Sequence, residues 1–473
     1  MYINGQWLTG RQEFPVINPA TGEVIGTVPD CTPEDIEAAL AAADTAFREW
    51  RKTTAYHRSQ LLYQAWELMT RRKAELAELM TREQGKPLKA SLNEVQYGAD
   101  FLLWFAEEAK RLYGQTIPSA RDNQRFLVQR SPVGVVGAIT PWNYPISMIT
   151  RKLAPALAAG CTVILKPAES TPLCAKAMME IFEEAGFPAG VVNLVTVQDP
   201  APIGNAFCSD PRVRKLTFTG STAVGKQLNA LAARNMKRVS MELGGHAPAI
   251  VFPDADPVHA AKGLSLVKFL NTGQACISPN RLFVHEDHVA AFTRELVSRT
   301  LRLIAGNGLS EGVGIGPLIN EAAIRKVEDQ VQNAVALGAV VETGGKRLTE
   351  GGLGEGCFFA PTVLSGVTRE MKIYREETFG PVAPIITYRS EDDVLAMAND
   401  TEYGLAAYIY SNNISTAMAA VDALDFGIIG VNDINPTSAA APFGGMKNSG
   451  LGREGAQQGI EEYLETKLAG FAL

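Results

Sequence analysis

Two residues stand in turns where covalent chemistry is possible. Cys276 lies in a polar, glycine-containing turn between a helical stretch and a strand, where a thiol can be exposed and activated. Glu242 ends a predicted strand just before two glycines, at the sheet edge where α/β proteins bind ligands. Each has a simpler interpretation, because most cysteines, Cys161 among them, are inert small hydrophobes, and a carboxylate at a strand end can form a salt bridge. The chemical interpretation is a thiol nucleophile with a nearby carboxylate base.

Two further strand ends carry polar side chains. Asn143, between two prolines, follows an apolar run over residues 133–139 and offers an amide donor for an oxyanion. A turn built by the two prolines explains this segment as simply. Lys166 and Glu169 follow the next apolar run, and they form either a surface ion pair of little worth or a pair of groups that hydrogen-bond ribose hydroxyls.

Residues 220–226, with the sequence GSTAVGK, nearly match the G-x-x-x-x-G-K-[ST] loop that binds nucleotide phosphates. Gln227 stands where that loop needs a hydroxyl for Mg²⁺, so an ATPase is disfavoured. Because the segment joins a strand to a helix, its glycines and the helix N-terminus still suit the phosphates of a dinucleotide. An ordinary strand-to-helix turn is the alternative.

These residues need a scaffold of alternating strands and helices. Thr32 caps a first predicted helix that starts with Pro33, and a long helical stretch is predicted over residues 57–113. Apolar runs then alternate with helical segments, at residues 133–139, 161–165, 191–195, 215–219 and 238–241, and later at 249–252, 281–284 and 382–388. This alternation is typical of βαβ units and parallel sheets, so we expect two α/β units. Outlying strands at 124–130 and 463–473 are expected to pair with another element or another subunit.

The composition excludes several classes of protein. The 473 residues are 46% hydrophobic and 20% charged, which is typical of a folded chain with more than one domain. The net charge of −7 offers no basic field for nucleic acid. Six scattered cysteines indicate neither a disulfide framework nor a metal centre, and they fit a reducing cytoplasm. No apolar run reaches the length of a membrane span, and the N-terminus does not resemble a signal peptide.

Seven short motifs, in this order, resemble the aldehyde dehydrogenase superfamily. They are PWNYP at 141–145, KPAE at 166–169, FTGS at 218–221, MELGG at 241–245, GQAC at 273–276, EETFGP at 376–381 and PFGGMK at 442–447. Each motif is weak alone, but seven at family-like spacing cover nearly the whole chain. Within the superfamily the sequence resembles NAD(P)-dependent succinate-semialdehyde dehydrogenases, with 2-oxoglutarate-semialdehyde dehydrogenases second.

The resemblance implies a covalent mechanism. Cys276 would attack the aldehyde carbon, while the Asn143 amide and the Cys276 backbone N–H hold the oxyanion of the thiohemiacetal. Hydride transfer to a nicotinamide would then leave a thioester. Glu242 matches the general base that deprotonates the hydrolytic water, and Glu454 matches a second glutamate associated with proton relay.

The resemblance also implies a nicotinamide dinucleotide and no metal. Lys166 and Glu169 match contacts to the adenosine ribose, and Glu169 should favour NAD, because a carboxylate repels a 2′-phosphate. NADP remains the weaker possibility, since Lys166 could tolerate the phosphate. The other matching cofactor residues are Thr140, Pro141, Trp142, Gly220, Ser221, Gly225, Leu243, Glu377 and Phe379.

For the substrate, the resemblance points to an aldehyde with a distal carboxylate. Arg151 matches the arginine that binds this group, and Ser438 matches a further contact; a solvated helix charge is the simpler interpretation of Arg151. Leu270 stands where that subgroup commonly has a second arginine, and Ser278 excludes the neighbouring-cysteine redox switch of some members. Succinate semialdehyde is therefore expected first, with 2-oxoglutarate or glutarate semialdehyde, or broad aldehyde specificity, as alternatives.

The implied architecture has three parts. A Rossmann-like parallel-sheet NAD-binding domain spans residues 1–117 and 130–244 with 429–455, an α/β catalytic domain spans 245–428, and a small β oligomerisation element comprises 118–129 and 456–473. The expected assembly is a cytoplasmic homodimer or homotetramer. A P-loop ATPase, opposed by Gln227, and a catalytically silent binding protein, opposed by the joint presence of Cys276, Glu242 and Asn143, are the competing classes.

Overall fold

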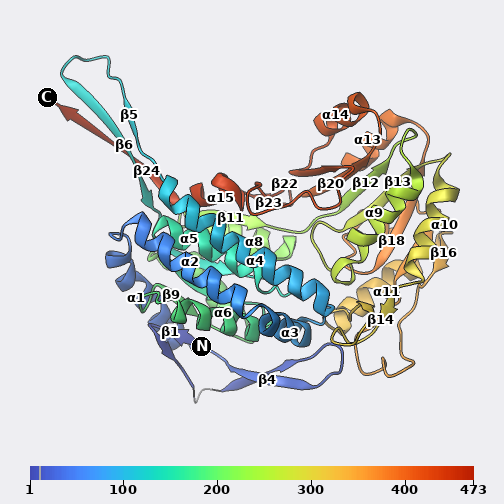
Figure 1. Ribbon diagram of the computed structural model, residues 1–473, viewed down its shortest axis with the longest axis horizontal. Coiled ribbons are helices and arrows are strands. Elements are labelled where there is room, and N and C mark those ends of the chain that lie inside the picture. Colours follow the sequence, from blue (N-terminus) through green and yellow to red (C-terminus); the bar gives the residue numbers. More distant parts are fainter. Residues whose placement is uncertain (10–11) are drawn as a thin grey trace.

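The computed structural model describes residues 1–9 and 12–473 and shows two lobes with a projecting arm (Figure 1). The first lobe is built on an eight-stranded sheet in the order β2-β1-β9-β8-β7-β10-β11-β23. Its five central strands are parallel, and the pairings at both edges are antiparallel. The strands are β1 (Tyr2–Ile3), β2 (Gln6–Trp7), β7 (Val135–Ile139), β8 (Thr162–Lys166), β9 (Val192–Leu194), β10 (Val213–Thr219), β11 (Arg238–Glu242) and β23 (Gly450–Leu451).

Helices cover both faces of this sheet, as continuous apolar strands require. Thr32 and Asp35 form the capping box that begins the first helix, which confirms the predicted start. The helices of this lobe are α1 (Pro33–Trp50), α2 (Ala55–Arg71), α3 (Lys73–Gln84), α4 (Leu88–Glu108), α5 (Ser147–Ala159), α6 (Pro172–Glu184), α7 (Ala201–Ser209) and α8 (Thr222–Ala233), with a short η1 (Ala109–Arg111) after α4.

The helical stretch predicted over residues 57–113 is three helices in the structure. The break between α3 and α4 falls at Gly85, whose φ of +93° closes α3 in the left-handed region. A Cβ at Gly85 would lie 2.6 Å from Pro317 and 2.9 Å from Pro19, so two distant segments of the chain require glycine at this turn. Periodicity alone does not reveal such a contact.

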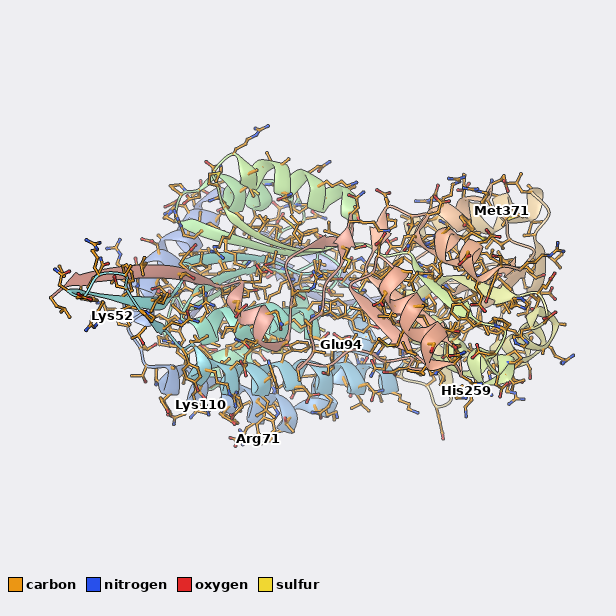
Figure 2. All side chains as sticks on the ribbon, turned by 90° about the horizontal axis from the view of Figure 1, so that it is seen from above. Lys52, Arg71, Glu94, Lys110, His259 and Met371 are labelled. Carbon is orange, nitrogen blue, oxygen red and sulfur yellow. The ribbon has the colours of Figure 1, made fainter. Side chains whose placement is uncertain are left out.

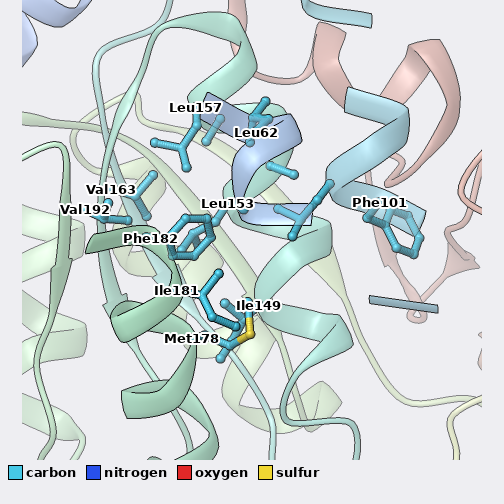
Figure 3. Close-up of a cluster of buried hydrophobic side chains, with 14 of the residues drawn as sticks. Leu62, Phe101, Ile149, Leu153, Leu157, Val163, Met178, Ile181, Phe182 and Val192 are labelled. Carbon is cyan, nitrogen blue, oxygen red and sulfur yellow. The ribbon is translucent and has the colours of Figure 1, made fainter. Parts of the chain in front are cut away.

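Helix α5 is the most deeply enclosed element of the first lobe, since all of its residues are buried. Figure 3 shows Ile149, Leu153 and Leu157 of this helix in the buried apolar cluster, together with residues of α2, α6 and the sheet. The burial of α5 places its two charged residues, Arg151 and Lys152, inside the protein. Each therefore needs a counter-charge or hydrogen-bond acceptor.

The second lobe contains a seven-stranded sheet in the order β16-β17-β18-β13-β12-β20-β21, parallel except for the β16–β17 pair. Its strands are β12 (Ala247–Val251), β13 (Pro279–His285), β16 (Val340–Thr343), β17 (Thr362–Ser365), β18 (Val382–Tyr388), β20 (Ala406–Tyr410) and β21 (Ile428–Val431). Its helices are α9 (Pro257–Phe269), η2 (Leu270–Gly273), α10 (Val289–Thr300), α11 (Glu321–Ala336), α12 (Lys372–Arg375), α13 (Glu391–Asn399) and α14 (Ile414–Ala423).

The arm is a three-stranded antiparallel sheet in the order β24-β6-β5. It consists of β5 (Gln115–Ile117), β6 (Gln124–Pro132) and β24 (Leu464–Ala472), and Figure 1 shows it extending from the first lobe with the C-terminus near its tip. Both predicted outlying strands are therefore strands, and they pair with each other. Residues 456–461, which were expected to belong to the strand element, instead form helix α15 (Ala456–Glu461).

Three short strand pairs complete the fold. They are β3 (Glu13–Ile17) with β4 (Val24–Pro29), β14 (Ile304–Ala305) with β15 (Val313–Ile315), and β19 (Tyr403–Gly404) with β22 (Met446–Lys447). Among the described residues, every helix is too short or too polar to cross a membrane. Figure 2 shows Glu94 near the middle of the molecule and Lys52, Arg71 and Lys110 at its periphery.

Arg281 on β13 ties three segments of the second lobe together. Its fully buried guanidinium donates hydrogen bonds to the backbone oxygens of His246, Met397 (3.0 Å) and Ala398 (2.7 Å). The last two carbonyls belong to the final turn of α13, where a cation also opposes the negative end of the helix dipole. Burial lowers the pKa of Arg281 to about 10, so the side chain stays charged at neutral pH.

Replacing Arg281 should destabilise the protein strongly. We expect Arg281→Met to lower the free energy of unfolding by about 3 kcal/mol or more, because three buried carbonyls lose their donor. Urea unfolding followed by fluorescence measures this change. Arg389→Met is the control, since Arg389 is 82% exposed and should change stability by about 0.5 kcal/mol or less. Equal unfolding midpoints for the two variants would contradict this role of Arg281.

Candidate active site

Two cavities meet at Cys276, between the two lobes. The first, here called the strand-end cavity, has a volume of about 360 Å³ and lies at the carboxyl ends of β7, β10 and β11. The second, the inter-helix cavity, has a volume of about 450 Å³ and is walled by α4, α5, the end of α9 and residues 434–443. Cys276 lines both cavities, so a group bound on either side can approach its sulfur.

Parallel strands bring the predicted residues together in the strand-end cavity. Adjacent strands are in register at their carboxyl ends, where Phe218 pairs with Ile139 and Thr219 pairs with Glu242. The turns that follow them meet at one edge of the sheet. The sequence-predicted residues that line this cavity are Pro141, Trp142, Asn143, Gly220, Ser221, Glu242, Leu243, Cys276, Glu377 and Phe379.

Four of the predicted cofactor residues lie outside this cavity. Lys166 and Glu169 form an ion pair at the end of β8, outside the described residues that line the strand-end cavity. Thr140 donates its backbone N–H to the carbonyl of Lys166 (3.1 Å). At Gly225 of α8, a Cβ would lie 2.3 Å from Leu243, so glycine lets the helix pack closely against the sheet.

The turn that carries Cys276 is strained. Asn271 and Thr272 have positive φ of 50° and 58°, followed by Gly273 at 75°, and left-handed backbone costs about 1 to 2 kcal/mol for each non-glycine residue. Hydrogen bonds to a neighbouring segment hold the turn in place. Thr272 Oγ1 donates to the Gly316 carbonyl (3.1 Å), and Gln274 Nε2 donates to the Pro317 carbonyl (3.2 Å). Such strain, held by the surroundings, is typical of functional sites.

Asn143 is fixed next to this turn from two sides. Its side-chain amide donates to the Gln274 carbonyl (3.0 Å), two residues before Cys276. Its own carbonyl accepts hydrogen bonds from Lys86 Nζ (2.7 Å) and from Asn271 Nδ2 (2.9 Å). The amide is thereby held beside the nucleophile turn, where it can serve as a donor to an oxyanion.

The sequence interpretation missed the buried pair that supports Asn143. Lys86 and Glu94 form an ion pair with both side chains about 1% exposed. Glu94 Oε1 also accepts hydrogen bonds from the backbone N–H groups of Ile146 (3.0 Å) and Ser147 (3.2 Å), at the start of α5. The sequence signal was only the glycine–lysine–proline break at residues 85–87, which does not indicate a partner.

Glu242 and Cys276 both line the strand-end cavity and interact electrostatically. The carboxylate is 3% exposed, and neither of its oxygens has a hydrogen-bond partner among the residues that the structure describes. Burial raises the pKa of Glu242, an effect that Arg151 partly opposes. Burial and the charge of Glu242 raise the pKa of the Cys276 thiol well above its ordinary value. A thiolate at Cys276 is therefore disfavoured while Glu242 is ionised, and Glu242 itself is a buried carboxylate that can take a proton from a water molecule.

Glu454 lies between the two cations of α5. Its Oε2 is 2.7 Å from an Arg151 terminal nitrogen, and its Oε1 pairs with Lys152. Lys152 also donates to Thr219 Oγ1 (2.6 Å), whose residue lines the strand-end cavity. Burial alone would raise the pKa of Glu454, but Lys152 and Arg151 bring it below its ordinary value. Glu454 is thus linked to the strand-end cavity through Lys152 and Thr219, a connection that the sequence motifs did not reveal.

Arg151 is not a solvated helix charge, since it is 1% exposed and lines the inter-helix cavity. Its guanidinium lies over the Phe443 ring, 4.0 Å from the centroid. Ser438 is not among the described residues that line this cavity, whereas its neighbour Thr437 is. Leu270 does line it, so the position expected for a second arginine contributes an apolar surface.

The strand-end cavity suits a nicotinamide dinucleotide. It lies at the carboxyl ends of parallel strands, beside the N-terminus of α8, where Ser221 Oγ accepts the Val224 N–H (3.4 Å). The Trp142 and Phe379 rings stand edge to face, 5.6 Å apart, and Glu377 Oε1 accepts the Gly245 N–H (2.9 Å). No cluster of three metal-ligating side chains occurs in the described part of the chain.

Comparison with known proteins agrees with this geometry. Residues 7–469 match the model of the aldehyde dehydrogenase family. The chain is 48% identical to glutarate-semialdehyde dehydrogenase of Pseudomonas putida and 48% identical to the NADP⁺ succinate-semialdehyde dehydrogenase of Escherichia coli, in each case over 98% of this chain and 96% of the relative. An aldehyde dehydrogenase structure from Brucella melitensis superposes with a TM-score of 0.97 at 48% identity, covering 100% of this chain and 96% of that one.

These matches confirm the resemblance and the α/β fold with parallel sheets that were expected from the sequence. They also decide between the competing classes in favour of an oxidoreductase over an ATPase or a silent scaffold. The chain belongs to the aldehyde dehydrogenase family, whose enzymes oxidise aldehydes to carboxylic acids with NAD(P).

Proposed function

We propose that this enzyme oxidises a short aldehyde with a distal carboxylate, succinate semialdehyde first and glutarate or 2-oxoglutarate semialdehyde next. The observation that carries the proposal is Arg151, a buried cation on the wall of the inter-helix cavity that Cys276 also lines. Its Nε has no hydrogen-bond partner in the described part of the chain, whereas one terminal nitrogen lies 2.7 Å from Glu454 Oε2. A carboxylate suits the free Nε donor and the positive charge of the guanidinium. The names of the relatives from P. putida and E. coli support this substrate class.

We further propose that Cys276 is the covalent nucleophile. The Cys276 sulfur attacks the aldehyde carbon as the thiol proton is released to solvent, and the aldehyde oxygen becomes an oxyanion held by the Asn143 amide. NAD(P), held in the strand-end cavity, would supply the acceptor for the hydride that leaves the tetrahedral carbon, so that Cys276 would carry a thioester. Water then attacks the thioester carbon as Glu242 takes one of its protons. The acid leaves, and Glu242 returns this proton to the Cys276 sulfur.

Glu454 is proposed to assist this proton traffic. It is connected to the strand-end cavity through Lys152 and Thr219, which makes a path for a proton possible. Because the two cations of α5 keep it ionised, its first effect is to hold Arg151 and Lys152 in place. Ser438, outside the cavity lining, is proposed only as a support for the neighbouring Thr437.

For the cofactor, we propose NAD in preference to NADP. Glu169 can accept hydrogen bonds from ribose hydroxyls and would repel a 2′-phosphate. Its ion pair with Lys166 weakens that repulsion, so NADP should bind, but less tightly. Glu377, Trp142 and Phe379 would hold the nicotinamide side. Thr140 and Gly225 would act indirectly, through the positions of the Lys166 backbone and of α8.

We propose the three predicted domains as the functional division, with the strand-end cavity of the first sheet holding the cofactor. The arm is proposed to join subunits into a homodimer or homotetramer. Its support is the exposure of apolar strand residues, with Leu468 at 62% and Phe471 at 49%. A cytoplasmic location is proposed from the six free cysteines, because an oxidising compartment favours disulfides.

The substrate proposal is tested by ranking aldehydes. We expect succinate semialdehyde to exceed butanal in kcat/KM by about tenfold or more, a difference of about 1.4 kcal/mol. Arg151→Met should reduce kcat/KM for the carboxylated aldehyde by roughly 2 to 4 kcal/mol and change butanal much less. NADH formation measures both rates. Equal losses on the two substrates would remove Arg151 as the carboxylate anchor.

The raised pKa of Glu242 predicts an acid limb in the pH profile. Thioester hydrolysis needs the carboxylate form, so kcat should fall on acidification through a pKa above the ordinary value of about 4.3. Glu242→Gln should leave a first burst of NADH and abolish further turnover at every pH. Stopped-flow absorbance at a series of pH values measures the burst and the steady state. Sustained turnover by the variant would show that another group is the base.

The arm proposal predicts that charges at its exposed apolar residues separate the subunits. We expect the double variant Leu468→Glu with Phe471→Glu to sediment as a monomer, with the circular dichroism of the parent. Tyr56→Glu is the control, because Tyr56 is an exposed aromatic residue of α2, outside the arm, at 75% exposure. An unchanged sedimentation coefficient for the double variant would place the interface elsewhere.

A further inference from the structure

One face of α4 lines the inter-helix cavity. Ala90, Asn93, Glu94 and Tyr97 follow one another at helical spacing, and all four belong to the cavity wall. Glu94 is already bound to Lys86. Tyr97 differs, because its hydroxyl oxygen is buried and has no hydrogen-bond partner among the residues described. A buried hydroxyl without a partner is unfavourable, so this group requires an explanation.

Tyr97 and Arg151 are neighbours on this wall. The rings of Tyr97 and Phe101 stand edge to face, with 5.0 Å between their centroids. The Arg151 guanidinium lies 5.7 Å from the centroid of the Phe101 ring. Phe101 is fully buried and holds both side chains. Burial raises the pKa of the Tyr97 phenol, and Arg151 opposes this effect. The phenol therefore remains protonated at neutral pH and is available as a donor.

The unpaired donors point to an anionic occupant. Tyr97 contributes a buried O–H, which has the Thr437 side chain beside it. Arg151 contributes its unpaired Nε, since one of its terminal nitrogens faces Glu454. Of the carboxylates that act on this region, Glu94 is engaged with Lys86 and Glu454 with Arg151 and Lys152, whereas Glu242 interacts with Arg151 electrostatically but forms no hydrogen bond with it. A carboxylate from a bound molecule has two oxygens, which is enough to accept from both the phenol and the guanidinium.

The cavity lacks a second cation where one was expected. Leu270 lies at the start of the turn that leads to Cys276, and it presents an apolar side chain to the cavity. The remaining polar residues of the wall near Tyr97 are neutral, Asn93, Asn435 and Thr437. Lys86 also lines the cavity but is paired with Glu94, so Arg151 and the neutral donors, among them the buried Tyr97 phenol, are left to bind a distal carboxylate.

We propose that Tyr97 is a specificity-determining residue whose phenol donates a hydrogen bond to one oxygen of the substrate's distal carboxylate, while Arg151 binds the other. This proposal rests on the proposed function, since it needs the aldehyde at Cys276 and the distal group in the inter-helix cavity. The Tyr97 phenol, a neutral donor, would then provide the second contact to the carboxylate, which an arginine at position 270 was expected to provide. A tyrosine kept only for packing would be replaceable by phenylalanine without any effect on substrate choice.

The test is Tyr97→Phe, which removes only the hydroxyl. With saturating NAD, we expect kcat/KM for succinate semialdehyde to fall on the order of 10- to 100-fold, mostly through KM, because the lost bond is to a charged group. For butanal, of the same chain length, the change should stay within about threefold. Tyr56→Phe, at an exposed tyrosine, is the control and should match the parent on both aldehydes.

Product binding gives a second measurement that does not depend on turnover of the variant. Succinate should inhibit the parent competitively against the aldehyde, and its inhibition constant should rise about tenfold or more in Tyr97→Phe. Inhibition by butyramide, which carries no charge, should be unchanged. Equal effects on the charged and uncharged ligands, or no effect on either, would overturn the assignment of Tyr97 alone. A parent enzyme that treats succinate semialdehyde and butanal alike would overturn both this assignment and the proposed substrate class.

Discussion

A charge buried in a protein needs a counter-charge, and this requirement organises the region between the two lobes. Helix α5 is enclosed on every side, so Arg151 and Lys152 cannot reach solvent. Glu454 supplies the opposite charge from a segment about 300 residues further along the chain. This ion pair fixes the C-terminal segment against the first lobe and sets the Arg151 guanidinium in the cavity wall. The position of the proposed carboxylate anchor is thus a consequence of packing.

A second buried pair acts in the same way on the oxyanion side. Lys86 and Glu94 hold the backbone on both sides of the Asn143 turn, and Asn143 in turn bonds to the segment that carries Cys276. The nucleophile is therefore braced from the first lobe although it belongs to the second. Cys276 lies between the strand-end cavity, proposed for the cofactor, and the inter-helix cavity, proposed for the substrate. Hydride transfer from a covalent adduct requires such an arrangement.

The sequence was sufficient to predict the strands and strand-end residues that depend on a local pattern of apolar residues. Apolar runs predicted the five parallel strands of the first sheet and, in the second sheet, β12, β13 and β18. The residues at the ends of β7, β10 and β11 meet at one edge because parallel strands must place them there. Long-range contacts were not predictable in the same way. The break at Gly85 depends on Pro19 and Pro317, and the partner of Arg151 is a glutamate that spacing does not connect to it. The unpaired hydroxyl of Tyr97 became visible only once α4 was placed against α5.

The most direct test of Cys276 as the covalent nucleophile is mass spectrometry of the Glu242→Gln protein, quenched in acid after mixing with NAD and succinate semialdehyde. Without its base, the enzyme should accumulate the thioester. We expect the mass of one succinyl group on the peptide that contains Cys276, in proportion to the NADH formed in the burst. NADH formation with an unmodified Cys276 peptide, or a succinyl group on another residue, would contradict the mechanism.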